Sequence, residues 1–132
     1  MNSEKVNKTE AEWRQLLSEE VFHILREKGT ERAFTGEYDK HFEAGAYHCA
    51  GCNAQLFEAN QKFDSHCGWP AFDAVKDSAV EEHTDKSFGM MRTEITCTTC
   101  GGHLGHVFND GPTKTGLRYC INSLSLKFIP KA

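Results

Sequence analysis

Residues 92–112, RTEITCTTCGGHLGHVFNDGP, join a β-forming run, a CxxC pair and a histidine-containing segment in direct succession. Isoleucine and threonine favour a strand before the cysteines, and the glycines after them disfavour a helix. Two residues between a pair of cysteines allow one tight turn to present both sulfurs to a single ion. This stretch therefore predicts a strand, a metal-binding turn and then a second strand or a loop.

A second CxxC pair, CAGC at residues 49–52, supplies the other half of a four-sulfur site. Tetrahedral thiolate coordination is typical of zinc, and a fully occupied sphere leaves no position for water or substrate. A thioredoxin-like redox pair is the alternative, but it requires a βα context and a single copy. The pattern favours one structural Zn²⁺ that staples distant segments of the chain through Cys49, Cys52, Cys97 and Cys100.

The N-terminal third carries a helical pattern. Apolar residues recur near helical spacing at Trp13, Leu16, Leu17, Val21, Ile24 and Leu25. Thr9 with Glu12 has the form of a capping box, and Gly29 follows basic residues as a stop signal. We expect one helix, or two separated at Ser18, serving as scaffold.

No stretch after Gly29 keeps a helical period, and short runs at 46–49, 90–96 and 124–129 carry β-formers between Gly, Asn and Asp. These runs predict a small antiparallel β domain with the helices packed on it. A chain of 132 residues has room for one core, so we expect a loose terminus at 1–9 and one domain at 10–132.

The composition excludes several classes of protein. Hydrophobic residues make up 39% and charged residues 26%, as in folded globular proteins. The net charge of -4, with both signs interspersed, gives no support for nucleic-acid binding. No apolar run approaches the ~20 residues of a membrane span, and the polar N-terminus lacks a signal-peptide core. We expect a cytoplasmic protein, whose six cysteines are metal ligands or reactive thiols.

Cys120, outside the CxxC pairs, lies in GLRYCINSLSL between Arg118 and Asn122. In a strand these three side chains project from one face. A cation beside a thiol lowers its pKa and increases the nucleophilic thiolate fraction. The alternative is a small buried thiol in a core strand.

Cys67, the other isolated cysteine, lies in FDSHCGWPAF, where Gly68 and Pro70 bracket Trp69 in a rigid turn. An indole face makes a good wall for a methyl-sulfur group, although core packing is the usual role of tryptophan. Downstream of the second CxxC pair, His103 and His106 could both reach a pocket as proton donors. Asp110 could orient one of these rings.

Together, CAGC, KFDSHCGWPAF, RTEITCTTCGGHLGHVFNDGP and TGLRYCINSLSLKF resemble, in order, the motifs of the methionine sulfoxide reductase B family over roughly residues 10–130. The resemblance implies a mainly β fold, with two small antiparallel sheets in a barrel-like or sandwich domain, and a four-cysteine zinc site. It makes Cys120 the nucleophile and Cys67 the resolving cysteine. The implied substrate is the R epimer of methionine sulfoxide in proteins or peptides, with thioredoxin as reductant, for a monomer acting in protein repair.

The same resemblance assigns the remaining site residues. It implies that Trp69 and Phe108 form the pocket for the substrate's methyl group. The site is completed by His103, His106, Asp110, Arg118 and Asn122, with His106 as the favoured acid. The chain departs from the family's commonest wording at His66, Ala71, Asn109 and Leu124. None of these is an assigned chemical position, so the departures leave the implied reaction in place and bear only on what the resemblance implies about substrate preference and rate.

Two other functions fit part of the pattern. A zinc-stapled interaction module explains the four ligands, but it leaves Cys67 and the row of Arg118, Cys120 and Asn122 without a role. A thiol peroxidase or disulfide oxidoreductase would also use two cysteines, but it would not need a methyl pocket.

Overall fold

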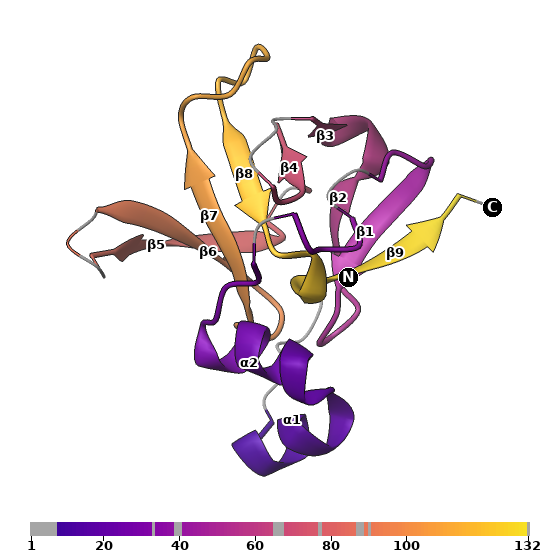
Figure 1. The fold of residues 1–132 in the computed structure, drawn as a ribbon, viewed down its shortest axis with the longest axis vertical. Helices are drawn as coiled ribbons and strands as arrows, with labels where there is room; N and C mark the ends of the chain where they lie inside the picture. The colour runs from indigo at the N-terminus through magenta and orange to yellow at the C-terminus, as the bar shows by residue number, and fades with distance from the viewer. Residues whose placement is uncertain are drawn as a thin grey trace.

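The chain forms two short helices followed by two antiparallel sheets (Figure 1). The computed structural model describes residues 8–32, 34–38, 41–64, 68–76, 78–86, 89 and 91–131. None of the helices in these ranges is long and apolar enough to cross a membrane. The helices are α1 (Glu10–Leu16) and α2 (Glu19–Glu27), and the short 3-10 turns are η1 (Ala59–Gln61) and η3 (Ser123–Ser125).

The smaller sheet has the strand order β2-β1-β9, and the larger has the order β3-β4-β8-β7-β6-β5. The strands are β1 (Gly45–Cys49), β2 (Gln55–Glu58), β3 (Lys62–Phe63), β4 (Ala71–Phe72), β5 (Val80–Asp85), β6 (Arg92–Cys97), β7 (His103–Phe108), β8 (Arg118–Ile121) and β9 (Leu126–Pro130). The predicted mainly β fold of two antiparallel sheets is confirmed. The run expected at 124–129 divides into η3 and β9, and Met90, expected in the β6 run, lies outside the described residues.

The helical region divides at Ser18, one of the two expected arrangements. Thr9 and Glu12 form the reciprocal hydrogen bonds of a capping box on α1, and the Ser18 hydroxyl accepts from the Val21 amide to begin α2. Residues 1–7, most of the terminus predicted to be loose, lie outside the described residues.

The end of α2 differs from expectation in one respect. Lys28, not Gly29, adopts the left-handed conformation, with φ 59°. A Cβ on Gly29 would overlap the His23 ring, an exposed side chain that would have to move aside.

The core lies between the two sheets and extends beneath the helices. Phe57 of β2 stacks on Phe72 of β4 with ring centroids 4.1 Å apart, which joins the two sheets. Trp13 and Leu25 bring the helices onto Gly51, in the first CxxC turn. The helices therefore cover the end of the molecule that carries the metal-binding turns.

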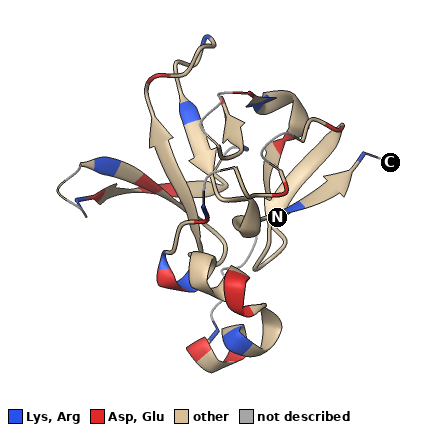
Figure 2. Ribbon diagram, in the orientation of Figure 1, with Lys and Arg blue, Asp and Glu red and all other residues tan. Residues whose placement is uncertain are grey.

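Acidic and basic side chains are mixed along the helices and the β5–β6 hairpin (Figure 2).

Candidate active site and metal centre

Four cysteines from the two CxxC turns meet at one point. Their Sγ atoms all lie within 4.8 Å of one another, and the Cys49–Cys100 and Cys52–Cys97 separations are both 3.6 Å. A tetrahedron with metal–sulfur bonds of ~2.3 Å has edges of ~3.8 Å. A disulfide, by contrast, needs a sulfur–sulfur distance of ~2.05 Å, and these four cysteines are free. The cluster therefore fits a tetrahedral metal ion.

The two CxxC turns have the same backbone design. In each turn the amide after the second cysteine donates to the carbonyl of the first, from Asn53 to Cys49 at 2.8 Å and from Gly101 to Cys97 at 2.7 Å. Asn53 and Gly101 both have positive φ, at 68° and 75°. Asn and Gly adopt this conformation most readily, which explains the residue types that follow the two motifs.

Hydrogen bonding among the four sulfurs shifts the pKa values of individual thiols in opposite directions. A hydrogen bond with Cys100 raises the pKa of the Cys49 thiol, and one with Cys100 lowers the pKa of the Cys97 thiol far below its usual range. Four thiolates at this spacing repel one another, and a divalent cation compensates that repulsion.

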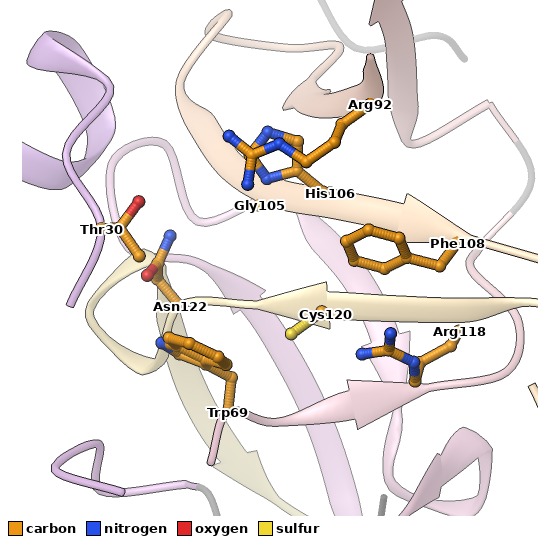
Figure 3. A pocket seen from close by; sticks show the side chains of 9 residues that line it. All are labelled: Thr30, Trp69, Arg92, Gly105, His106, Phe108, Arg118, Cys120 and Asn122. Atoms are coloured by element: carbon orange, nitrogen blue, oxygen red, sulfur yellow. The ribbon is translucent and has the colours of Figure 1, made fainter. Parts of the chain in front are cut away.

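A pocket of about 290 Å³ opens on the larger sheet (Figure 3). Cys120 lies on its floor, with Trp69 on one side and His106 and Phe108 on the other. The lining residues are Thr30, Trp69, Arg92, Gly105, His106, Phe108, Arg118, Cys120 and Asn122. Six residues of the predicted site are thus brought together.

Strand pairing places the thiol opposite an imidazole. Arg118 and Cys120 lie two residues apart on β8, and Asn122 follows two residues after Cys120. All three side chains line the pocket, as the alternation of side chains along a strand predicts. The β7–β8 register sets His106 opposite Cys120. A Cβ on Gly105 would collide with the Cys120 carbonyl, so this glycine allows β7 and β8 to approach.

A β-bulge explains how two histidines three residues apart reach the same face. In a regular strand that spacing would place them on opposite faces. The β6–β7 register shifts so that Ile95 pairs with Gly105 but Thr96 pairs with His103, which leaves Leu104 as the extra residue. The ring centroids of His103 and His106 are consequently 5.6 Å apart.

The two imidazoles have different surroundings. His103 is 3% exposed, does not line the pocket, and its Nδ1 lies 2.8 Å from Glu94 Oε2. Burial lowers the pKa of His103, against the opposing effect of that hydrogen bond. Burial alone would raise the pKa of Glu94, but hydrogen bonds with His103 and Lys28 hold it below its usual value. His103 is therefore a neutral ring held by a carboxylate.

His106 is held by a residue that the sequence analysis did not single out. Its Nε2 lies 2.8 Å from Oδ2 of Asp85, the last residue of β5. The same Asp85 oxygen lies 3.5 Å from the Arg92 guanidinium. Asp85 therefore joins two side chains that line the pocket.

Asp110 occupies a different place from the one expected. It accepts two hydrogen bonds from Arg118, at 2.8 and 3.1 Å, instead of orienting either imidazole. The Arg118 guanidinium also lies 4.5 Å from the Phe108 ring centroid. This ion pair lowers the pKa of the exposed Asp110 carboxyl and fixes Arg118 at the rim of the pocket.

The segment after α2 supports Trp69 and Asn122. The Trp69 indole donates to the Glu31 carbonyl, and the Glu31 amide donates to Asn122 Oδ1, both at 3.0 Å. Asn122 Nδ2 in turn donates to the carbonyl of the bulged Leu104. Cys67, the predicted resolving cysteine, lies outside the described residues.

Thr30, Asp85, Arg92 and Glu94 belong to the site but were missed by sequence reasoning. One signal could have found three of them, namely charged residues on alternating positions of the paired β5 and β6 strands. Asp85 pairs with Arg92, and Arg92 and Glu94 share a face. Thr30 follows a helix and carried no such signal.

Comparison with known proteins gives a consistent result. The model of the SelR domain matches residues 17–130. A peptide methionine sulfoxide reductase MsrB of Agrobacterium fabrum is 58% identical over 98% of this chain and 97% of its own. Proteins of the same name from Chromohalobacter salexigens and Leptospira interrogans are 58% and 57% identical, each over 97% of this chain and 98% of their own.

A solved structure shares the fold at much lower sequence similarity. The Yippee-like domain of Mis18 has a TM-score of 0.55 and 17% identity, over 68% of this chain and 99% of that domain. At this identity the likeness concerns the fold alone.

Proposed function

The chain belongs to the SelR-domain family of MsrB peptide methionine sulfoxide reductases, and from this membership we propose that it reduces the R epimer of methionine sulfoxide in oxidised proteins and peptides. It is an oxidoreductase, and reduction of methionine sulfoxide repairs oxidised proteins. The observation that supports the proposal most is the pairing of Cys120 with His106 across β7 and β8, at the floor of a pocket walled by Trp69 and Phe108.

The reduction step joins a thiolate, a proton donor and an apolar wall. The Cys120 thiolate attacks the sulfoxide sulfur while His106 donates a proton to the sulfoxide oxygen. The oxygen passes to Cys120 as a sulfenic acid, the sulfoxide sulfur is reduced by two electrons, and methionine leaves. Trp69 and Phe108 hold the substrate's methyl group, because aromatic faces bind a methyl-sulfur unit favourably.

The remaining predicted residues hold this machinery in place. Arg118, fixed by Asp110, stands two residues before Cys120 and favours its thiolate form. Asn122 anchors β8 to the bulge of β7. His103 packs edge-on against His106 and supports its ring.

Regeneration of the thiolate requires a second cysteine. The Cys67 thiol attacks the Cys120 sulfenic sulfur, which forms a disulfide and releases water. A thioredoxin-type dithiol then reduces that disulfide by exchange and is itself oxidised. No organic cofactor takes part.

One Zn²⁺ is the proposed occupant of the four-cysteine cluster. Zinc takes four thiolates tetrahedrally, and such a closed site contributes folding energy and performs no chemistry. Residues 10–132 act as one catalytic domain, and the protein works as a monomer in the reducing cytoplasm, where thiolate ligands and a thiol nucleophile persist.

The deciding experiment compares separated R and S epimers of a peptide methionine sulfoxide, with dithiothreitol as reductant, for the zinc-loaded protein and its Cys120→Ser variant. We expect R-selective reduction that is lost in the variant. Reduction of hydroperoxides in place of sulfoxides would favour a thiol peroxidase. Folded protein inert toward both epimers would overturn the proposal in favour of an interaction module.

A further inference from the structure

We propose that Asp85 is a positioning residue for sulfoxide reduction, holding the His106 ring so that one fixed nitrogen faces the substrate oxygen. This inference rests on the proposed function, in which His106 donates the proton. Asp85 ends β5, a strand of which no described residue lines the pocket, so it acts through its neighbours His106 and Arg92.

The first support is the geometry of one carboxylate oxygen. Asp85 Oδ2 is 2.8 Å from His106 Nε2 and 3.5 Å from the Arg92 guanidinium, and the His106 and Asp85 side chains are only 12% and 14% exposed. His106 and Arg92 lie together on the wall of the pocket opposite Trp69 (Figure 3). A carboxylate shared by two donors restricts the rotation of both side chains.

The second support is that the other carboxylate near the two histidines is already engaged. Glu94, which lies opposite His106 in the β6–β7 register, directs Oε2 to His103 and Oε1 to Lys28. The charged or titratable groups that face His106 from β5, β6, β7 and β8 are Asp85, Arg92, Glu94, His103 and Cys120. Among the carboxylates in the described part of the chain, Asp85 is the one bonded to His106.

The chemical consequence concerns which nitrogen meets the substrate. Because Nε2 of His106 is bound to Asp85, Nδ1 is the nitrogen left for the sulfoxide oxygen, and it donates its proton there from the doubly protonated ring while Nε2–H stays on Asp85. Nδ1 makes no hydrogen bond to any residue in the described ranges. Loss of Asp85 would let the ring turn and reduce the fraction of complexes with a correctly placed donor, since proton transfer needs hydrogen-bond distance.

The test is a double-mutant cycle on single-turnover reduction of an R-sulfoxide peptide. We expect Asp85→Ala to lower the rate at saturating substrate about 100-fold, within the range for a general acid, with KM changed by less than about threefold. Asp85→Asn keeps an acceptor oxygen and should recover about tenfold of that loss. In a His106→Asn background, Asp85→Ala should cost nothing further, because the two residues act as one unit.

Two controls separate positioning from a general structural effect. Alkylation of Cys120 by iodoacetamide needs no proton donor, so its rate should be unchanged in Asp85→Ala. Glu82→Gln, on β5 but on the opposite face of the sheet, should leave the reduction rate and alkylation unchanged.

Each outcome of these experiments either supports or overturns the role of Asp85. Additive losses in the cycle, a parallel fall in alkylation, or an unchanged rate in Asp85→Ala would overturn the inference. If Asp85→Ala does not fold, the cycle uses Asp85→Asn, whose smaller loss of about tenfold must also vanish in the His106→Asn background. Wild-type protein without R-sulfoxide reductase activity would instead overturn the proposed function.

Discussion

The four-sulfur cluster and the Cys120 pocket place the same side chain in two opposite settings. In the cluster, every cysteine has three sulfur neighbours within 4.8 Å, and Cys49 and Cys97 are fully buried at strand ends. Cys120 is half-buried in the middle of the larger sheet and faces a pocket, an imidazole and an arginine. Access and neighbouring charge therefore distinguish cysteines suited to holding a metal ion from a cysteine suited to reaction with a substrate.

Breaking the cluster should have the largest effect. Cys49→Ser, or removal of the metal by a chelator, should lower the free energy of unfolding by roughly 5 kcal/mol or more, because metal-binding energy is folding energy. Thermal unfolding measures this, with Cys120→Ser as the matched control that should melt within about 2 °C of wild type. An unchanged melting temperature in Cys49→Ser would contradict the structural role of the cluster.

Removing the second reactive thiol should stop turnover without stopping the first reaction. Cys67→Ser should release one methionine per enzyme and then lose at least about 100-fold of its turnover with thioredoxin, because the sulfenic acid has no partner thiol. A burst assay measures both quantities. Full turnover with thioredoxin would mean that another resolving route operates.

Removing the Trp69 side chain from the pocket wall should reduce activity less than removing the thiol of Cys120 or Cys67. Trp69→Ala should lower kcat/KM for the R-sulfoxide about 10- to 100-fold, equivalent to about 1–3 kcal/mol for a buried methyl-sulfur contact, and Trp69→Phe should retain most of the activity. Alkylation of Cys120 in the same variants reports whether the thiol is intact. Equal activity in Trp69→Ala and wild type would remove Trp69 from the substrate pocket.

The buried pair of His103 and Glu94 gives the smallest and most specific test, through the pH dependence of stability. Burial lowers the pKa of His103 below its ordinary 6.5, so the unfolded chain binds the extra proton first. The contribution of neutral His103 to the free energy of unfolding should be fully present above about pH 6.5, and it should be lost as the pH falls through the lowered pKa of His103. Glu94, whose pKa is also lowered, adds a second decline that begins below about pH 4.5.

Melting curves of zinc-loaded protein across this range provide the measurement. His103→Asn should flatten the first decline, and a variant with the wild-type slope would show that another group carries it.

Much of the fold was predictable because its signals are local. The Thr9 capping box, the division at Ser18 and the two CxxC turns depend on residues close together in sequence, and all three appear as expected. The row of Arg118, Cys120 and Asn122 followed from the two-residue period of a strand.

The rest of the site depends on register, which the sequence does not display. Asp85 meets His106 only because β5 pairs with β6 and β6 with β7, and the pairing of Asp110 with Arg118 needs the β7–β8 turn to close. Asp110 is nearer to His106 in sequence and was therefore the carboxylate predicted to orient a ring, whereas Asp85 is the carboxylate bonded to His106. Sequence proximity is a poor guide between strands.

The bulge at Leu104 changes how the motif should be compared among proteins. Since one residue of His103–His106 is bulged, a spacing of three behaves geometrically as a spacing of two. A relative lacking the bulged residue could carry its histidines two positions apart and still present both, if another side chain filled the core position of Leu104. An alignment gap at this point would then record a change in backbone shape with the chemistry retained, and a fixed-spacing motif search would overlook such a protein.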